Sequence, residues 1–178
     1  MSISYDLALY LDLELTCGVL PQGEAPSIIQ IGICEADLNQ MKVTRMSSFF
    51  VRPMRPFTIT DECTLLTTIT REEVLKGKYL NEVLNTLKKL YSTQKKMCIT
   101  WGNDKDALDN ACINPFKNMA DISWCHKLAH INENAMSLSK ALQMEGLIFP
   151  GRCHNAVDDA HATALLHMKM ITKARNNT

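Results

Sequence analysis

Leucine occupies every second position near the start of the chain, at 7, 9, 11, 13 and 15. This alternation is typical of a β-strand with one packed face, and we predict a strand over Tyr5–Leu15. The same alternation places Asp12 and Glu14 side by side on the other face, near the end of the strand. Two adjacent carboxylates repel each other and resist desolvation, so the pair favours a bound cation. An ordinary solvated strand end is the alternative.

Four further apolar runs predict strands. They cover Ile28–Glu35, Met41–Val51, Met97–Trp101 and Met119–Ile122. Pro21, Gly23 and Pro26 predict a loop over Thr16–Ser27, and the residues 37–40 predict a turn. The first three strands are therefore expected to form an antiparallel meander.

Helices are predicted from capping and from helical spacing of apolar residues. Thr70 and Glu73 form a capping box, so a helix is expected to begin there and to end near Gly77. Further helices are predicted over Thr60–Leu66, Tyr79–Tyr91, Asp104–Cys112, Ser123–Ile131, Ser137–Glu145 and Val157–Lys173. Three strands followed by alternating helices and strands indicate an α/β fold, with a mixed sheet flanked by helices.

Length and charge narrow the class of protein. The 178 residues, 46% of them hydrophobic and 21% charged, suit a single domain over 1–178 with a substantial core. The 19 basic and 19 acidic residues give no net charge. A general nucleic-acid coat needs a strong basic excess, which this chain lacks. A site that grips a few phosphates with local cations remains compatible with this balance.

Seven cysteines are scattered through the chain, and no two of them form a C-x-x-C pair. We expect reduced thiols and a cytoplasmic location rather than a disulfide framework. The sequence has no apolar run of 18 residues and no basic segment followed by an apolar one at its start. We therefore expect neither export nor a membrane partner.

Candidate chemistry gathers where acidic residues follow strands or begin helices. Besides Asp12 and Glu14, Asp104 follows a buried strand that breaks at Gly102, and Asp159 lies at the entry to the last helix. Acidic residues also stabilise the first turn of any helix through its dipole, so each of these helix-start acids alone has an ordinary structural explanation.

Taken together, these residues carry a family resemblance. Asp12-x-Glu14, an aspartate after the middle strand and His154-x4-Asp159 resemble the three motifs of the DEDDh subgroup of DnaQ-like 3′–5′ exonucleases. The segments 12–17, 51–53 and 63–70 are similar to the branch that contains histone-mRNA and small-RNA 3′ exonucleases and KapD-like proteins. The resemblance covers roughly residues 5–170 and implies a ribonuclease H-like (exonuclease) fold, with a central mixed sheet flanked by helices.

The resemblance also implies an activity. It points to a metal-dependent 3′–5′ exonuclease that releases nucleoside 5′-monophosphates from single-stranded 3′ ends, with RNA favoured over DNA. Four acidic residues would hold two Mg²⁺ or Mn²⁺ ions, and these are Asp12, Glu14, Asp104 and Asp159. Two cations about 3.5–4 Å apart can stabilise both the attacking and the leaving oxygen of a phosphodiester. His154 would take a proton from the attacking water, because imidazole titrates near neutral pH.

The same resemblance assigns the terminal nucleotide to two pairs of residues, Leu15 with Thr16 and Leu66 with Thr67. A leucine would wedge against the base, and polar or backbone groups would contact the sugar. A contact to the 2′-hydroxyl would favour RNA. The alternative is that Leu66 belongs to the core and Thr67 caps a helix.

Two features depart from the family pattern. Thr68 stands where the family often has glycine. The aspartate of the second motif usually follows the glycine by three residues, whereas here acids follow Gly102 by two and by four, at Asp104 and Asp106. We favour Asp104 because Leu108 then lies one helical turn later as an inward apolar anchor, and Asp106 is the reserve candidate.

Two other classes of function fit parts of the sequence. One is a catalytically weak nucleic-acid-binding or interaction module on the same fold, suggested by the irregular second motif. The other is a structural zinc protein, because His126 and His130 are four residues apart on a predicted helix, with Cys125 and Cys153 as further candidate ligands. Lys127 occupies the place of the glutamate in the zinc-protease motif, so that motif is absent.

Overall fold

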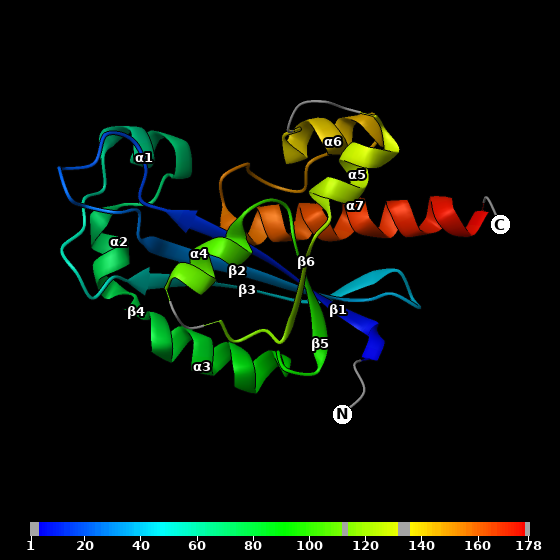
Figure 1. Cartoon of the computed structure of the whole chain (residues 1–178), viewed down its shortest axis with the longest axis horizontal. Coiled ribbons are helices and arrows are strands. Elements are labelled where there is room, and N and C mark those ends of the chain that lie inside the picture. Colours follow the sequence, from blue (N-terminus) through cyan, green and yellow to red (C-terminus); the bar gives the residue numbers. More distant parts are fainter. Residues whose placement is uncertain (1–3, 112–113, 132–135, 177–178) are drawn as a thin grey trace.

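The computed structural model describes residues 4–111, 114–131 and 136–176. Its strands form one mixed six-stranded sheet in the order β4-β3-β2-β1-β5-β6 (Figure 1). The strands are β1 (Ser4–Leu15), β2 (Ile28–Asp37), β3 (Lys42–Arg52), β4 (Lys78–Tyr79), β5 (Lys96–Thr100) and β6 (Asn118–Asp121). The helices are α1 (Asp61–Thr67), α2 (Arg71–Lys76), α3 (Leu80–Tyr91), α4 (Asp104–Asn110), α5 (Ser123–Ala129), α6 (Leu138–Met144) and α7 (Ala156–Asn176).

The strand pairing confirms the predicted fold class. β1 pairs antiparallel with β2, and β2 pairs antiparallel with β3, which gives the expected meander. On its other edge β1 pairs parallel with β5, and β5 pairs parallel with β6. β4 was not predicted, because two residues beside β3 are too short to give a period in the sequence. The predicted end of α4 at Cys112 lies outside the described residues.

The prediction that β1 has one packed face is wrong. Leu9, Leu11 and Leu13 pack into a core with α3, as the leucine alternation indicates. On the opposite face Ala8 and Tyr10 are equally buried, against α7. The reason is topological, since a strand in the middle of a sheet with helices on both sides has no solvent face along most of its length. Figure 1 shows α3 and α7 on opposite sides of the sheet.

Small residues let α7 approach the sheet closely. Its buried residues Ala160 and Ala164 pack on Ala8 and Ala36 of the neighbouring strands. The closest approach is at Gly32 of β2, where an added Cβ would lie 2.0 Å from the carbonyl carbon of Ala156 and 2.3 Å from the amide nitrogen of Val157. The missing side chain at Gly32 therefore sets how near the first turn of α7 comes to β1 and β2.

The start of α7 is also tied to the sheet by a buried hydrogen bond. The amide of Ala156 donates to Oε1 of Gln30, which is itself buried in β2. The residue opposite Gly32 in the ladder is Asp12 of β1, and the residue opposite Gln30 is Glu14. The first turn of α7 is thus fixed next to the two acidic residues of β1.

None of the helices within the described ranges combines the length and the apolar composition that a membrane span would need.

We predict that Gly32→Ala destabilises the protein. The methyl group would meet backbone atoms, which cannot move aside as a side-chain end can. Overpacking of this kind costs about 1–3 kcal/mol, so thermal unfolding should show a Tm lower by about 3–10 °C. The control is Ser48→Ala on β3. Ser48 pairs with Gly32 across the sheet and is exposed, so this change should shift Tm by less than about 2 °C. An unchanged Tm in Gly32→Ala would contradict the proposed packing constraint.

Candidate active site

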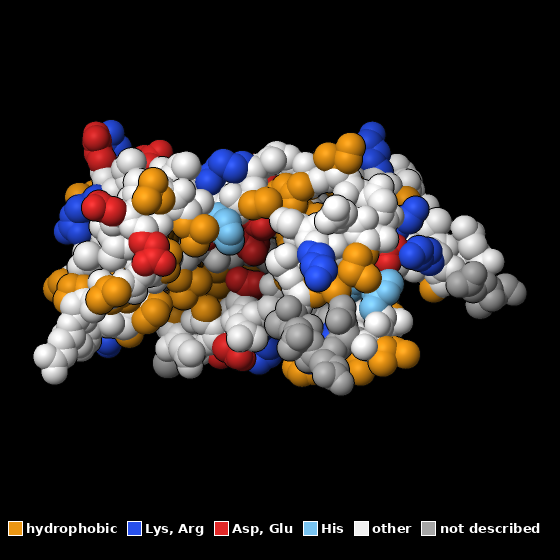
Figure 2. All heavy atoms as spheres, turned by 90° about the horizontal axis from the view of Figure 1, so that it is seen from above, with side chains coloured by type: hydrophobic (Ala, Val, Ile, Leu, Met, Phe, Trp, Pro, Cys, Tyr) orange, Lys and Arg blue, Asp and Glu red, His pale blue; other side chains and the backbone are white. Residues whose placement is uncertain are grey.

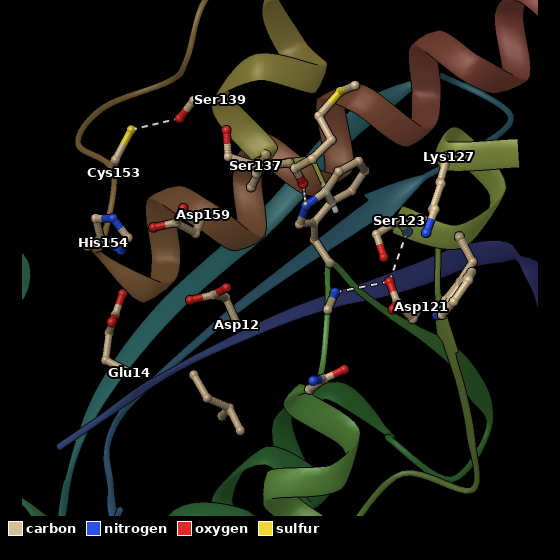
Figure 3. A pocket seen from close by; sticks show the side chains of 17 residues that line it. Asp12, Glu14, Asp121, Ser123, Lys127, Ser137, Ser139, Cys153, His154 and Asp159 are labelled. Atoms are coloured by element: carbon tan, nitrogen blue, oxygen red, sulfur yellow. Dashed lines mark hydrogen bonds between the residues drawn. The ribbon is translucent and has the colours of Figure 1, made fainter. Parts of the chain in front are cut away.

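An open cavity of about 520 Å³ lies where β1 and β5 end and α7 begins. Figure 2 shows acidic side chains at the floor of a hollow in this face, with a histidine beside them. The acidic residues that line the cavity next to the histidine, His154, are Asp12, Glu14 and Asp159 (Figure 3). In open α/β sheets, ligands commonly bind at the carboxyl ends of the strands, at the point where the strand order reverses.

Three carboxylates meet at the floor of the cavity. Asp12, Glu14 and Asp159 each offer an oxygen, and these oxygens all lie within 4.8 Å of one another. Two come from the same face of β1 and the third from the first turn of α7. Asp159 is held in place because its Oδ2 accepts a hydrogen bond from the amide of Asn155, 3.0 Å away, just before the helix begins.

Asp104, in the first turn of α4, contacts β1 next to these carboxylates. Its Oδ1 accepts a hydrogen bond of 3.1 Å from the amide of Leu13, the residue between the two acids of β1. Asp104 is buried and Leu108, one turn later, is fully buried in the core beneath the sheet, whereas Asp106 is exposed. Of the two sequence candidates, the fold therefore brings Asp104 next to β1 and turns Asp106 toward solvent.

Burial and mutual repulsion raise the pKa values of these acids. Desolvation, followed by the charges of Asp104, Asp159 and Glu14, raises the pKa of Asp12 well above its usual value. Desolvation is also the main cause that raises the pKa of Glu14 to about 7, with Asp159 adding to it and the nearby charge of Arg152 opposing it.

The other two acids behave in the same way. Desolvation raises the pKa of Asp104 to about 7 against the opposing hydrogen bond from Leu13, and it raises the pKa of Asp159 against hydrogen bonds from the backbone of 154–155. A site of this kind binds a cation more readily than it bears its own negative charge.

His154 stands at the exposed rim of the cavity, in the left-handed backbone conformation with φ of 60°. The guanidinium of Arg152 fixes the backbone around it by donating to three carbonyl oxygens. It contacts His154 O at 3.1 Å, Leu66 O at 3.2 Å and Thr67 O. From the sequence Arg152 looks like a scattered surface cation, because no sequence pattern reveals carbonyl partners 85 residues away.

The four predicted nucleotide-binding residues are not among the described residues that line the cavity. Thr16 and Thr67 are buried. The hydroxyl of Thr16 accepts a hydrogen bond from the amide of Ser27. The hydroxyl of Thr67 donates to the carbonyl of Cys63 and accepts from the amide of Ile69. Leu15 is half-buried and packs against the core below the sheet. The side chain of Leu66 is 43% exposed, so the alternative that it belongs to the core is wrong.

Other lining residues were not among the site residues predicted from the sequence. Asp121, at the end of β6, accepts hydrogen bonds from the amides of Gly102 and Ser123 and so braces two strand-to-helix turns (Figure 3). Trp124 is 59% exposed, and the ammonium of Lys127 lies 5.0 Å from the centre of its ring. The one sequence pattern that points to Asp121 is its position two residues before the start of α5.

The donor set at the floor suits hard divalent cations. All the available ligand atoms are carboxylate oxygens, which Mg²⁺ and Mn²⁺ prefer. No ion pair formed within the described chain neutralises Asp12, Glu14 or Asp159. The residues therefore fit the binding of divalent cations, with the imidazole of His154 beside them.

Comparisons with known proteins agree with this geometry. The family model described as Exonuclease (RNase_T) matches residues 9–167. The "Probable 3′-5′ exonuclease KapD" of Bacillus subtilis (strain 168) is 30% identical over 162 residues, which cover 85% of this chain and 78% of that protein.

Solved structures show the same fold. A full-length 3′-exonuclease superposes with a TM-score of 0.83 at 21% identity and covers 98% of this chain, which in turn spans 63% of that protein. The nuclease domain of 3′hExo, a DEDDh family member bound to rAMP, gives a TM-score of 0.80 at 20% identity, with 97% and 95% of the two chains covered. The resemblance predicted from the three acidic motifs is confirmed, and this chain belongs to the exonuclease family RNase_T.

Proposed function

We propose that residues 1–178 act as a DEDDh-type, metal-dependent 3′–5′ exonuclease that releases nucleoside 5′-monophosphates from single-stranded 3′ ends, with RNA favoured over DNA. One observation carries the proposal. Carboxylates from β1 and α7, segments more than 140 residues apart, lie within 4.8 Å of one another at the floor of an open cavity that His154 also lines. The six described cysteines are free thiols, which supports a cytoplasmic enzyme.

Four acids are assigned to a pair of Mg²⁺ or Mn²⁺ ions. Asp12 would contact both ions, with Glu14 and Asp159 on the one next to the attacking water. Asp104 would support the other, through a water molecule, because it is not among the three carboxylates that meet within 4.8 Å. Two bound cations would stabilise the charge that develops on the attacking and leaving oxygens.

The protein side chains then supply position and proton transfer. Asp104 and Asp159 hold fixed orientations through the amides of Leu13 and Asn155. His154 takes the proton of the attacking water as general base at the cavity rim. Arg152 is a positioning residue, since its three carbonyl contacts hold the backbone of His154 against the segment 66–67.

The substrate end of the proposal involves Leu15, Thr16, Leu66 and Thr67. Leu66 is the exposed member and is assigned the contact with the terminal base. The hydroxyls of Thr16 and Thr67 and the amide of Thr16 already have partners, so contacts to the sugar are assigned to the other backbone groups of these segments. Structural neighbours include a 3′-exonuclease with its histone mRNA stem-loop and exonuclease I of E. coli with a dA16 oligonucleotide, so the fold serves both RNA and DNA.

We predict that Asp12→Ala abolishes nucleotide release. Loss of a residue that contacts both ions removes several kcal/mol of transition-state stabilisation, and the rate should fall by about 1,000-fold or more. The assay follows end-labelled single-stranded RNA in Mg²⁺ or Mn²⁺, and a chelator should have the same effect. His154→Ala should cost about 100- to 10,000-fold.

The matched control is Asp106→Ala, which removes an exposed acid two residues from Asp104 and should leave the rate unchanged within about twofold. Binding of single-stranded ends without release of nucleotides, under either ion, would instead indicate the catalytically weak binding module. Products of internal cleavage would contradict the exonuclease.

The raised pKa values predict that the metal-free protein loses stability as pH rises. The folded protein binds protons at Glu14 and Asp104 up to a pKa of about 7, whereas the unfolded chain releases them near pH 4. The contribution of these two acids to stability is therefore greatest below about pH 4, falls between about pH 4 and 7, and is lost above that range. Divalent cations should reverse the loss, and they should bind more tightly as pH rises through 7.

Asp12→Asn tests this prediction, because it removes one charge from the cluster without removing volume. In chelator at pH 8 its Tm should exceed that of the wild type by several degrees, and the difference should shrink at pH 5. The stabilisation by Mg²⁺ should be smaller in the variant. Asp106→Asn serves as the control, and a lower Tm for Asp12→Asn than for the wild type at pH 8 in chelator would contradict the electrostatic interpretation.

A contact to the terminal 2′-hydroxyl predicts a preference that resides in one nucleotide. We expect an RNA oligonucleotide with a single 2′-deoxy residue at its 3′ end to lose its first nucleotide about tenfold more slowly than all-RNA, as loss of one hydrogen bond would cause. A deoxy residue placed five nucleotides upstream is the control. Equal rates for the first nucleotide of all three substrates would contradict the RNA preference.

A further inference from the structure

A second group of metal-binding side chains lies where α5 meets the end of α6. His126 belongs to α5, His130 follows α5 directly, and Glu145 follows α6 directly. One ligand atom from each lies within 4.8 Å of the other two. This group shares no residue with the carboxylates at the floor of the cavity.

His126 is an unusual anchor for a helix. It is the only buried residue of α5, at 1% exposure, while Leu128 is 73% exposed. Neither ring nitrogen of His126 makes a hydrogen bond to any residue that the structure describes. An imidazole always carries either a free lone pair or an extra proton, so burying it without partners is costly. A metal ion bound to one of these nitrogens would remove this cost.

The spacing of the ligand atoms matches a tetrahedral zinc site. Oε1 of Glu145 lies 3.2 Å from Nε2 of His130 and 3.8 Å from Nε2 of His126. Zinc binds imidazole nitrogen and carboxylate oxygen at about 2.0–2.2 Å, which separates neighbouring ligand atoms by about 3.3–3.6 Å. The third pair of atoms, from His126 and His130, lies within 4.8 Å, and closing the site would bring this pair to the same separation.

The remaining oxygen of the carboxylate already has its partner. Nζ of Lys173, on α7, lies 2.5 Å from Oε2 of Glu145. An outer partner of this kind orients a ligating carboxylate, and Oε1 faces the two imidazoles, where it is hydrogen-bonded with Nε2 of His130. The cysteines that the sequence suggested are not part of the group, since Cys125 is exposed and Sγ of Cys153 lies 3.1 Å from the hydroxyl of Ser139.

We propose that His126, His130 and Glu145 bind one structural zinc ion, with water as the fourth ligand. The ion would connect α5 to α6, two seven-residue helices that flank the segment 132–135. Nitrogen ligands favour zinc over the hard cations proposed for the carboxylates, so the two sites would select different metals.

The zinc site would also support one wall of the cavity. The ring of His126 packs edge-on against Trp101 with centres 5.6 Å apart. Trp101 lines the cavity, and its Nε1 donates a hydrogen bond to the carbonyl of Met136, another lining residue. Zinc would therefore act on the wall and on protein stability without contacting the carboxylates.

The test measures zinc in the Asp12→Asn protein, where binding at the carboxylates is weakened. The protein is stripped with chelator, titrated with zinc chloride in excess Mg²⁺, and analysed for bound metal after gel filtration. We expect one zinc ion per chain and a Tm raised by several degrees. Added to this background, His130→Gln and Glu145→Gln should each weaken zinc binding by at least about 100-fold, more than the loss of an outer partner costs.

The matched control is His161→Gln, the same change at a histidine of α7 outside the group, which should retain one zinc ion. Cobalt in place of zinc should give the intense visible absorption of a tetrahedral site, and His130→Gln should lose it. Absence of bound zinc in the Asp12→Asn protein, or equal binding in His130→Gln and His161→Gln, would overturn the proposal. In that case the group is an ion-pair cluster built on Glu145 and Lys173. Neither outcome affects the exonuclease proposal, which the activity of the wild type tests separately.

Discussion

The approach of α7 to β2 at Gly32 is the contact on which the rest of the site depends. A helix packed on ordinary side chains would stand too far from the sheet for its first turn to reach the acids of β1. With no side chain at Gly32 and with Gln30 bonded to the amide of Ala156, the first turn of α7 instead presents Asp159 to Asp12 and Glu14. Backbone packing in the core thus determines the distances between carboxylates at the surface.

The same packing makes the site costly to build. Desolvation and like charges raise the pKa values of all four acids, so the metal-free fold ionises them less readily than the unfolded chain does. Sites that must bind cations commonly carry such a penalty, which the surrounding core offsets. Here the offset comes from two apolar layers, one between the sheet and α3 and the other beneath α7.

The sequence predicted the elements whose residues carry a period, and missed contacts that connect distant segments. Leucine alternation located β1 and its acids, but it did not show that Ala8 and Tyr10 bury the second face. The choice of Asp104 rested on Leu108, and the fold turns both inward because α4 begins immediately after the bend at Gly102. The hydrogen bonds of Arg152 and the approach of Glu145 to the two histidines produce no periodic pattern in the sequence. Only the three-dimensional structure reveals them.

The floor and the rim of the cavity are held by different kinds of interaction. The floor is part of the sheet, where apolar packing on both faces fixes the strands. The rim is held mainly by polar contacts, with Arg152 joining the segment 66–67 to His154 on one side. On the other side, Asp121 accepts hydrogen bonds from the amides of Gly102 and Ser123, and His126 is the buried residue of α5.

Polar contacts between exposed segments open more readily than a packed core. Under the proposed function, the rim would adapt to a nucleotide while the carboxylates keep their spacing. One guanidinium contacts the carbonyl of Leu66, the predicted base contact, and the carbonyl of His154, the proposed general base. A change in the position of the terminal nucleotide would therefore change the position of His154. With these proposed roles, substrate recognition and proton transfer would be coupled through Arg152 rather than through the four acids.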